Sequence, residues 1–142
     1  MGDVFYNKAV TVYNKYADGV MEKETWFPTV LNNVRLLITK GANISTSGME
    51  TADSAKLFVR PEYLPEGKTY LEPLKWGAIP DDEKYGYVTF AADDFFVGGD
   101  TTNEDSTQPG FFQYMKSRYD NCFRITNTDS YELIPHWEVG GK

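Results

Sequence analysis

Cysteine and histidine each occur only once in this chain of 142 residues. A single cysteine cannot form an internal disulfide, and one residue of each kind excludes a zinc site built from cysteine and histidine within one chain. Cys122 has no neighbouring histidine and no Cys-X-X-Cys pattern, so we expect a small buried side chain rather than a reactive thiol. Synthesis in a reducing compartment is the simplest expectation.

Basic residues are also scarce, because 14 lysines and arginines against 21 aspartates and glutamates leave a formal net charge of −7. An acidic chain without a basic stripe between its aromatic residues is poorly suited to nucleic acid, so we expect no sequence-specific binding. The glycine pairs at 98–99 and 140–141 do not open a phosphate-binding loop. The apolar runs, such as Leu36 to Ile38, are too short to span a bilayer, and the start of the chain does not resemble a signal peptide.

Patterns typical of catalysis and of metal binding are also missing. His136 is the only candidate imidazole base, and no serine or cysteine nucleophile stands near it in the sequence. Acidic residues that could bind calcium occur at 81–82, at 93–94 and in the segment 100–105. The last of these lacks the glycine that an EF-hand loop has at its sixth position, so we expect no calcium site. We therefore expect no enzyme, no metal and no cofactor.

Aromatic residues, in contrast, make up 15% of the chain, which favours strands and contact surfaces over helix bundles. Alternation of apolar and polar residues predicts the strands. They are expected at 9–16, 23–30, 34–39, 54–60, 85–90, 95–97, 122–129, 131–134 and 136–139. Pro28 lacks an N–H and places its strand at a sheet edge or breaks it, and Asn32-Asn33 supplies a turn or bulge.

One helix is expected at about 109–119, with Pro109 in its first turn and Phe111, Phe112, Met115 and Tyr119 at helical spacing. The segments 40–53, 61–80 and 100–108 are expected to be long loops, possible sites of mobility, with short edge strands at 70–72 and 74–76. The four residues 81–84 are expected to form a solvated turn. The prediction is a single, mainly β domain over 1–142, a small antiparallel β-barrel or sandwich with one short inserted helix.

The same alternation predicts which side chains form the core. They are Val10, Val12, Trp26, Val34, Leu36, Leu57, Val59, Tyr87, Phe95, Val97, Phe111, Met115, Phe123 and Ile125. In the last strand Trp137 and Val139 should face one way and His136 and Glu138 the other, with Gly140 to Lys142 as a flexible end near a contact surface.

Several segments together resemble small structural proteins from phages and prophages of Gram-positive bacteria. The opening Val10 to Tyr16, followed by Trp26 and by Thr29 to Val34, is similar to the start of these proteins. Asp94 to Asp100 resembles their "Gly-Asp, apolar pair, Gly-Asp" strand, with Asp93 where a glycine is usual. Arg124 to Asp129 resembles their "Ile-Thr-Ser-Val-Asp" strand, and the ending His136 to Lys142 is the most specific match. Pro61 to Pro80 departs from the pattern.

The resemblance implies a structural virion component, a minor capsid protein or a head–tail connector of the neck, such as a head-completion or stopper protein. It implies phage portal, neck or tail proteins as partners and a homo-oligomeric ring in the virion, with assembly in the bacterial cytoplasm and no membrane. An acidic channel would let DNA pass without sticking.

The alternative that the aromatic content leaves open is a ligand-binding β module, for example one that binds carbohydrate. Two tryptophans coplanar in one open groove would favour it, whereas buried tryptophans and protruding loops would favour assembly. In the ligand-binding alternative Trp26, Trp76 or Trp137 would be the stacking surface. The interface candidates for assembly are Trp137, His136, Glu138, Trp26, Trp76, Ile44 and Met49.

Overall fold

The structure is a computed structural model. It describes residues 4–18, 23–40, 42–45, 48–51 and 53–142, with the backbone alone at 17–18, 23, 42–45 and 48–51. The strands are β1 (Lys8–Asp18), β2 (Lys23–Thr39), β3 (Ala42–Ser45), β4 (Gly48–Thr51), β5 (Ser54–Val59), β6 (Thr69–Tyr70), β7 (Tyr87–Val88), β8 (Phe95–Gly98), β9 (Cys122–Tyr131) and β10 (His136–Gly141). The helices are α1 (Pro73–Ala78) and α2 (Phe111–Arg118), with 3₁₀ helices η1 (Pro61–Tyr63) and η2 (Asp81–Gly86).

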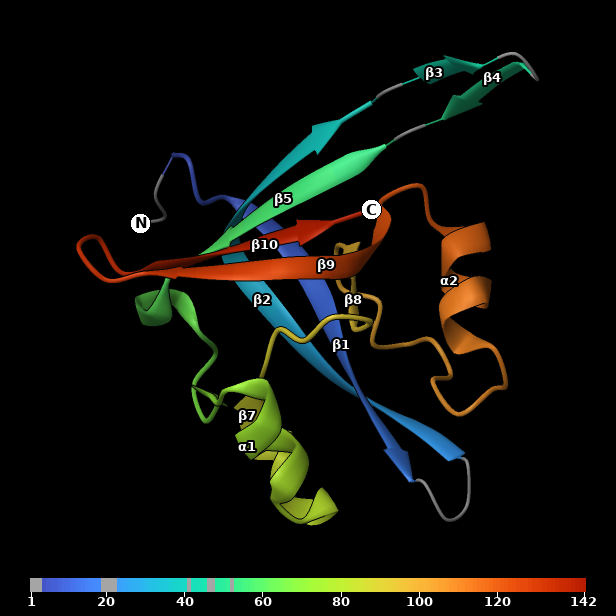
Figure 1. Ribbon diagram of the computed structural model, residues 1–142. Coiled ribbons are helices and arrows are strands. Elements are labelled where there is room, and N and C mark those ends of the chain that lie inside the picture. Colours follow the sequence, from blue (N-terminus) through green and yellow to red (C-terminus); the bar gives the residue numbers. More distant parts are fainter. Residues whose placement is uncertain (1–3, 19–22, 41, 46–47, 52) are drawn as a thin grey trace.

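Six strands close into an antiparallel barrel in the order β1-β2-β5-β10-β9-β8 (Figure 1). The predicted fold class, mainly β with a small antiparallel barrel, is confirmed. The predicted helix is α2, which lies against the outside of the barrel. It begins at Phe111, after Gly110 in a left-handed conformation, so the expectation that Pro109 stands in its first turn is wrong.

β2 is one continuous strand where the sequence predicts two. Lys8 pairs with Val34 but Val10 pairs with Leu31, so β2 carries one extra residue, the predicted bulge. Asn33 adopts a left-handed φ of 59°, which asparagine tolerates better than most residues. Beyond the bulge β2 leaves β1 and pairs with β5, so the bulge turns the corner of the barrel.

Pro28 lies in the part of β2 that pairs with β1 alone. This part of β2 has a free edge, so the missing N–H of Pro28 leaves no neighbouring strand without a donor, as predicted for a strand at a sheet edge.

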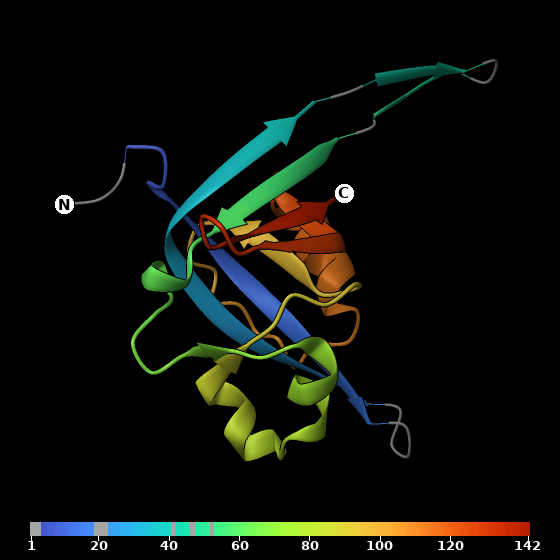
Figure 2. The ribbon, with the colours of Figure 1, turned by 60° about the vertical axis from the view of Figure 1, so that its left-hand side comes forward.

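A hairpin arm projects from the barrel where the sequence predicts only a loop at 40–53. β2 and β5 continue outward, and β3 pairs with β4 beyond them, from Ala42 opposite Thr51 to Ser45 opposite Gly48 (Figures 1 and 2). The loop expectation is therefore wrong for the backbone of these eight residues, because cross-strand pairing extends the hairpin beyond the barrel. The suggested mobility stays a prediction.

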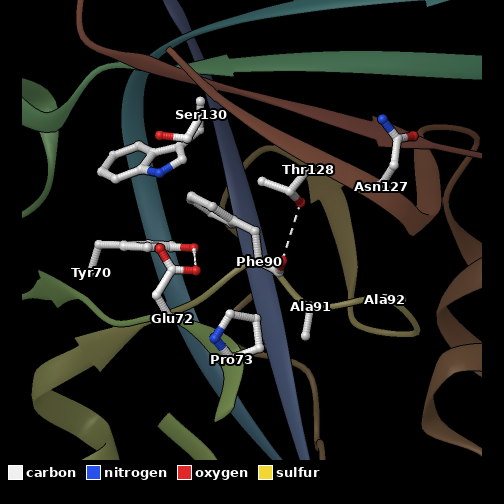
Figure 3. A pocket seen from close by; sticks show the side chains of 10 residues that line it. Tyr70, Glu72, Pro73, Phe90, Ala91, Ala92, Asn127, Thr128 and Ser130 are labelled. Carbon is white, nitrogen blue, oxygen red and sulfur yellow. Dashed lines mark hydrogen bonds between the residues drawn. The ribbon is translucent and has the colours of Figure 1, made fainter. Parts of the chain in front are cut away.

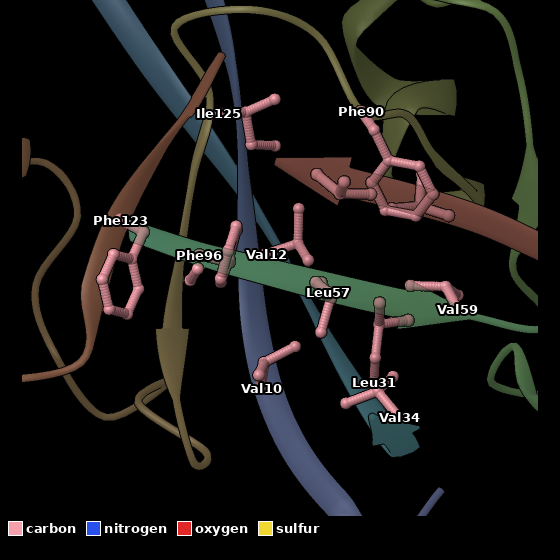
Figure 4. Packing of buried hydrophobic residues seen from close by; sticks show 13 residues of the cluster. Val10, Val12, Leu31, Val34, Leu57, Val59, Phe90, Phe96, Phe123 and Ile125 are labelled. Atoms are coloured by element: carbon pink, nitrogen blue, oxygen red, sulfur yellow. The ribbon is translucent and has the colours of Figure 1, made fainter. Parts of the chain in front are cut away.

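The barrel interior is filled by one apolar cluster (Figure 4). Val10 and Val12 of β1 meet Leu57 of β5, Phe96 of β8 and Phe123 of β9 there, as side chains that alternate inward along each strand. Twelve of the fourteen predicted core residues are buried. The other two, Leu36 and Tyr87, are half-buried, and Val88 takes the inward position expected for Tyr87.

A second apolar core lies on the outside of the barrel wall. Sequence alternation alone did not show that the predicted core residues belong to two separate clusters. Tyr13 of β1, on the face expected to be polar, packs with Trp26, Phe95, Phe111 and Met115. The Tyr13 and Phe95 rings stack with centroids 4.8 Å apart. Helix α2 covers this face, so β1 and β8 are buried on both sides.

The proline-rich segment differs most from expectation. The predicted edge strand at 74–76 is wrong, because Pro73 occupies the first turn of α1 and presets its backbone for a helix. The predicted strand at 85–90 is reduced to β7, since η2 occupies its first residues. The expected solvated turn at 81–84 is wrong at Lys84, which is 1% exposed. Its Nζ donates to the Ile79 carbonyl at 2.5 Å and lies 4.4 Å from the Tyr16 ring centroid.

The C-terminal glycines form part of a strand and not a flexible end. Gly140 pairs with Asn127 in β9, and Lys142 exchanges two backbone hydrogen bonds with Arg124. A Cβ on Gly141 would lie 3.0 Å from the Phe123 Cβ and 3.1 Å from the Phe96 ring. Glycine therefore suits the close approach of β10 to this aromatic pair.

The segment 100–108 is anchored by its own polar side chains. Tyr13 and Thr101 share a 2.6 Å hydrogen bond between their hydroxyls, and Glu104 accepts from Tyr119 at 2.5 Å and from the Arg118 Nε at 2.8 Å. Among the described residues, none of the helices has the length and apolarity that crossing a bilayer requires.

Candidate contact surface

The outer face of β10 carries two of the predicted contact residues. The His136 Nε2 lies 3.0 Å from Glu138 Oε2, and its Nδ1 lies 2.7 Å from the carbonyl oxygen of Ile134. Both partners are acceptors, and the imidazolium, with an N–H on each ring nitrogen, can donate to both. The Glu138 and Ile134 hydrogen bonds accordingly raise the pKa of His136, and the bond from His136 lowers the pKa of Glu138. The predicted shared face of these two residues is confirmed.

Aromatic and cationic groups extend this face across the neighbouring strands. The rings of Tyr131 and His136 stack at 4.7 Å with an angle of 6°, and Phe58 of β5 lies 6.3 Å from His136 on its other side. Arg35 of β2 lies 5.4 Å above the Phe58 ring. The result is a row of flat side chains across β9, β10, β5 and β2, stabilised by stacking and cation–π attraction.

The turn between β9 and β10 ends this row in an apolar tip. Leu133 is 98% exposed and Ile134 is 66% exposed, and Pro135 follows before β10 begins. The predicted strand at 131–134 is wrong, because only Tyr131 belongs to β9 and the rest is turn. We call Leu133 and Ile134 the apolar tip.

Trp137, the residue between His136 and Glu138 on β10, lines a groove of about 290 Å³. Figure 3 labels the other residues that line this groove. The Trp137 indole lies 4.5 Å from the Tyr70 ring and 5.7 Å from the Phe90 ring. Pro73 of α1 closes one end and Ser130 of β9 borders the other. We call this the aromatic groove.

The rim of the aromatic groove is polar. Glu72 accepts a long hydrogen bond of 3.5 Å from the Tyr70 hydroxyl. Burial and the Glu72 carboxylate raise the pKa of Tyr70 to about 12, so the phenol stays protonated. The Thr128 hydroxyl, on the opposite wall, donates to the Phe90 carbonyl at 3.1 Å. A half-buried aromatic wall with hydroxyl, amide and carboxylate groups on its rim suits apolar or amphipathic groups.

The other predicted contact residues lie elsewhere. Trp26 belongs to the second core, and Trp76 is buried against Phe27 at 5.5 Å, so neither indole offers a surface to another molecule. Trp26 is buried under α2, as the core prediction requires. Trp76 is covered by Phe27 and by Lys84 of η2, which the sequence did not indicate. The side chains of Ile44 and Met49 lie outside the described residues.

The single cysteine, Cys122, is buried at the start of β9. Burial raises the pKa of the Cys122 thiol to about 11, which keeps it protonated, as expected for a buried side chain. Among the described residues no group of three histidine, cysteine or acidic side chains lies close enough to hold a metal ion.

Sequence reasoning missed a buried polar cluster at Asp94. Its carboxylate accepts from the backbone N–H of Lys15 at 3.0 Å, from Asn14 Nδ2 at 2.9 Å and from the Ala91 N–H at 3.3 Å. Burial nevertheless raises the pKa of Asp94 to about 6. The cluster fastens the loop before β8 to β1, and the alternation pattern holds no signal for it.

Residues 5–142 match the model of a family described as a family of unknown function, DUF6751. The chain belongs to this family. No curated protein and no solved structure matches it.

Proposed function

We propose that this protein is a structural virion component of a phage or prophage of Gram-positive bacteria. The role is that of a head–tail connector, neck or minor capsid protein that acts by self-assembly and protein–protein contacts rather than by catalysis. Its partners would be portal, neck or tail proteins, and it would assemble in the bacterial cytoplasm and remain in the virion.

The observation that carries the proposal is the hairpin arm of β2, β3, β4 and β5. The backbone of β3 pairs only with β4 among the described pairings, beyond the closed barrel (Figures 1 and 2). A ribbon that leaves its own core has unpaired edges and two open faces, which neighbouring subunits can cover.

A second ribbon supports the same role. The far ends of β1 and β2, from Asn14 opposite Phe27 to Asp18 opposite Lys23, pair only with each other and point in a different direction from the arm (Figure 1). A barrel with two ribbons and an apolar tip suits a subunit with several neighbours in a ring. The net charge of −7 is compatible with a channel that does not retain DNA.

The test is localisation in purified particles. A strain that carries the gene should yield virions in which mass spectrometry finds the chain in a fixed ratio to the portal protein. Deletion of the gene should leave heads and tails unjoined or DNA unretained. Complete, infectious particles made without the chain would overturn the proposal.

The aromatic groove favours a second candidate function, binding of a small ligand such as a carbohydrate. Trp137 and Tyr70 supply aromatic faces, and Glu72 and Thr128 supply hydrogen-bonding groups. Trp26 and Trp76 do not join Trp137 there, since both are buried elsewhere. Titration calorimetry with a panel of oligosaccharides tests this candidate, with Trp137→Ala expected to abolish any heat of binding.

A further inference from the structure

The side chain of His136 ties the turn between β9 and β10 to the barrel. The paired register of the two strands ends with His136 opposite Tyr131, so residues 132–135 lie beyond it. The His136 Nδ1 lies 2.7 Å from the carbonyl oxygen of Ile134, within this turn. The backbone of the turn is therefore held by a hydrogen bond whose donor is a titratable ring.

Neighbouring side chains hold the imidazole ring in place. Tyr131 of β9 stacks on one face of the ring, with centroids 4.7 Å apart, and Phe58 of β5 lies 6.3 Å away on the other side. The Nε2 atom lies 3.0 Å from Glu138 Oε2. A ring flanked on both faces and bound at one nitrogen has little freedom to swing to a new partner when its charge changes.

The two acceptors match the imidazolium and not the neutral ring. An imidazolium carries an N–H on each nitrogen and can donate to Glu138 and to the Ile134 carbonyl at once. A neutral imidazole has a single N–H, so one of the two acceptors must then face a lone pair of the ring. The charged carboxylate is the stronger acceptor, so the remaining N–H should stay on Nε2. The Nδ1 lone pair would then oppose the Ile134 oxygen, and the two atoms repel each other.

Charged and titratable groups surround His136 from each neighbouring element. The hydrogen bonds to Glu138 and Ile134 raise the pKa of His136, whereas burial and the positive charge of Arg60, which follows β5, lower it. The other groups are Tyr131 of β9, Lys56 of β5, which lies 3.4 Å from Glu138, and Glu132, which borders the same hollow as His136. The net effect is a raised pKa, so the ring loses its proton above the ordinary value for histidine, about 6.5.

We propose that the turn between β9 and β10 is a pH-dependent switch, held in one conformation while His136 is an imidazolium and released when the ring is neutral. In the held state the Ile134 carbonyl is bound and the apolar tip has one orientation. In the released state this carbonyl turns to water and the tip becomes mobile. Such a switch needs only a histidine whose partners suit one charge state and an element that its hydrogen bond holds. It is a property of the free chain and goes beyond the proposed virion role.

The test follows the proton and the turn in the same protein. His136 is the single histidine of the chain, so nitrogen NMR of its ring is unambiguous. A nitroxide spin label on Leu133→Cys, at an almost fully exposed position, reports the mobility of the turn, while the buried Cys122 should stay unlabelled. Between about pH 5 and about pH 9, the ring should change from protonation of both nitrogens to Nε2–H alone. The label should change from restricted to mobile with the same midpoint.

Matched variants separate the switch from other effects of pH. A label on Leu74→Cys, at an exposed leucine of α1, should have the same mobility at every pH. His136→Phe keeps an aromatic ring for the stack but has no N–H, so the label at position 133 should be mobile throughout. Glu138→Gln removes the carboxylate that raises the pKa of His136, so the midpoints of ring and label should move together to lower pH.

Three results would overturn the proposal. The first is a label at position 133 whose mobility stays constant while the histidine titrates. The second is a neutral ring that keeps its N–H on Nδ1, because the hydrogen bond to Ile134 would then survive. The third is a His136→Phe variant in which the turn stays restricted at every pH.

Discussion

His136 and Glu138 stand two residues apart on β10, and their side chains meet on the outside of the barrel with Nε2 3.0 Å from Oε2. Because the Ile134 carbonyl faces the other ring nitrogen, the folded chain holds the imidazolium more firmly than the unfolded chain does. Protonation of one side chain is thereby coupled to the base of the apolar tip.

This coupling predicts a pH dependence of stability. The folded-state pKa of His136 is raised, so its contribution is complete below the unfolded pKa, about 6.5, and is lost as pH rises through the folded pKa. The free energy of unfolding of wild type relative to Glu138→Gln should therefore fall as pH rises above about 6.5, by about 1 kcal/mol or less for a pair near the surface. Urea denaturation across this range measures it, and a difference that does not vary with pH would contradict the coupling.

Asp94 should be among the most sensitive acidic positions of the chain. Asp94→Asn would turn one amide NH₂ towards N–H donors of Lys15, Asn14 or Ala91, leaving buried donors unsatisfied. We expect a loss of about 1–3 kcal/mol in the free energy of unfolding. The matched control is Asp93→Asn, since Asp93 is exposed and asparagine tolerates its φ of 76°. Equal stability of the two variants would show that the Asp94 cluster does not hold the loop.

The raised pKa of Asp94 adds a pH dependence of its own. The folded chain binds this proton more tightly than the unfolded chain, so stability from this group grows as pH falls through about 6 towards 4. In Asp94→Asn this increase should disappear, while Asp93→Asn should retain it. Thermal melting at pH 7 and pH 5 for wild type and both variants would reveal the difference.

Gly141→Ala tests the close approach of β10 to the aromatic pair. The new Cβ would lie 3.0 Å from Phe123 and 3.1 Å from Phe96, both buried, so neither neighbour can move cheaply. We expect a loss of about 1–3 kcal/mol. Gly77→Ala in α1 is the control, because nothing lies within 4 Å of its added Cβ, and it should be neutral or slightly stabilising. Similar melting temperatures for the two variants would contradict this account of Gly141.

Replacement of Trp26 and of Trp137 by alanine should lower the free energy of unfolding by different amounts. Trp26→Ala removes the indole that packs 4.9 Å from Phe95 in the second core and should cost about 3–5 kcal/mol. Trp137→Ala should cost less, because its indole is half-buried. Chemical denaturation of both variants measures the difference, and a Trp26→Ala variant as stable as wild type would contradict the second core.

The sequence predicted the barrel well because alternation along a strand reflects its position in a closed sheet. The bulge at Asn32-Asn33 was predictable for a similar local reason, since asparagine accepts left-handed backbone. The sequence also predicted that His136 and Glu138 share a face, because side chains two residues apart in a strand point to the same side.

Other features depend on tertiary packing and have no local signal. Tyr13 faces outward from the barrel, yet α2 covers it, so alternation alone assigns it to solvent. Lys84 is buried by the rings of Tyr16 and Trp76, which lie far from each other in the sequence. The aromatic groove joins Tyr70, Phe90 and Trp137 from three separate segments, so only the folded chain brings it together.

The most direct test of the proposed role is the native mass of the chain mixed with the portal protein encoded nearest to its gene. The account predicts a complex in which the portal ring gains a fixed whole number of copies of this chain. A portal ring of unchanged mass, with this chain left free at every ratio and ionic strength, would contradict the claim that the protein is a neck component.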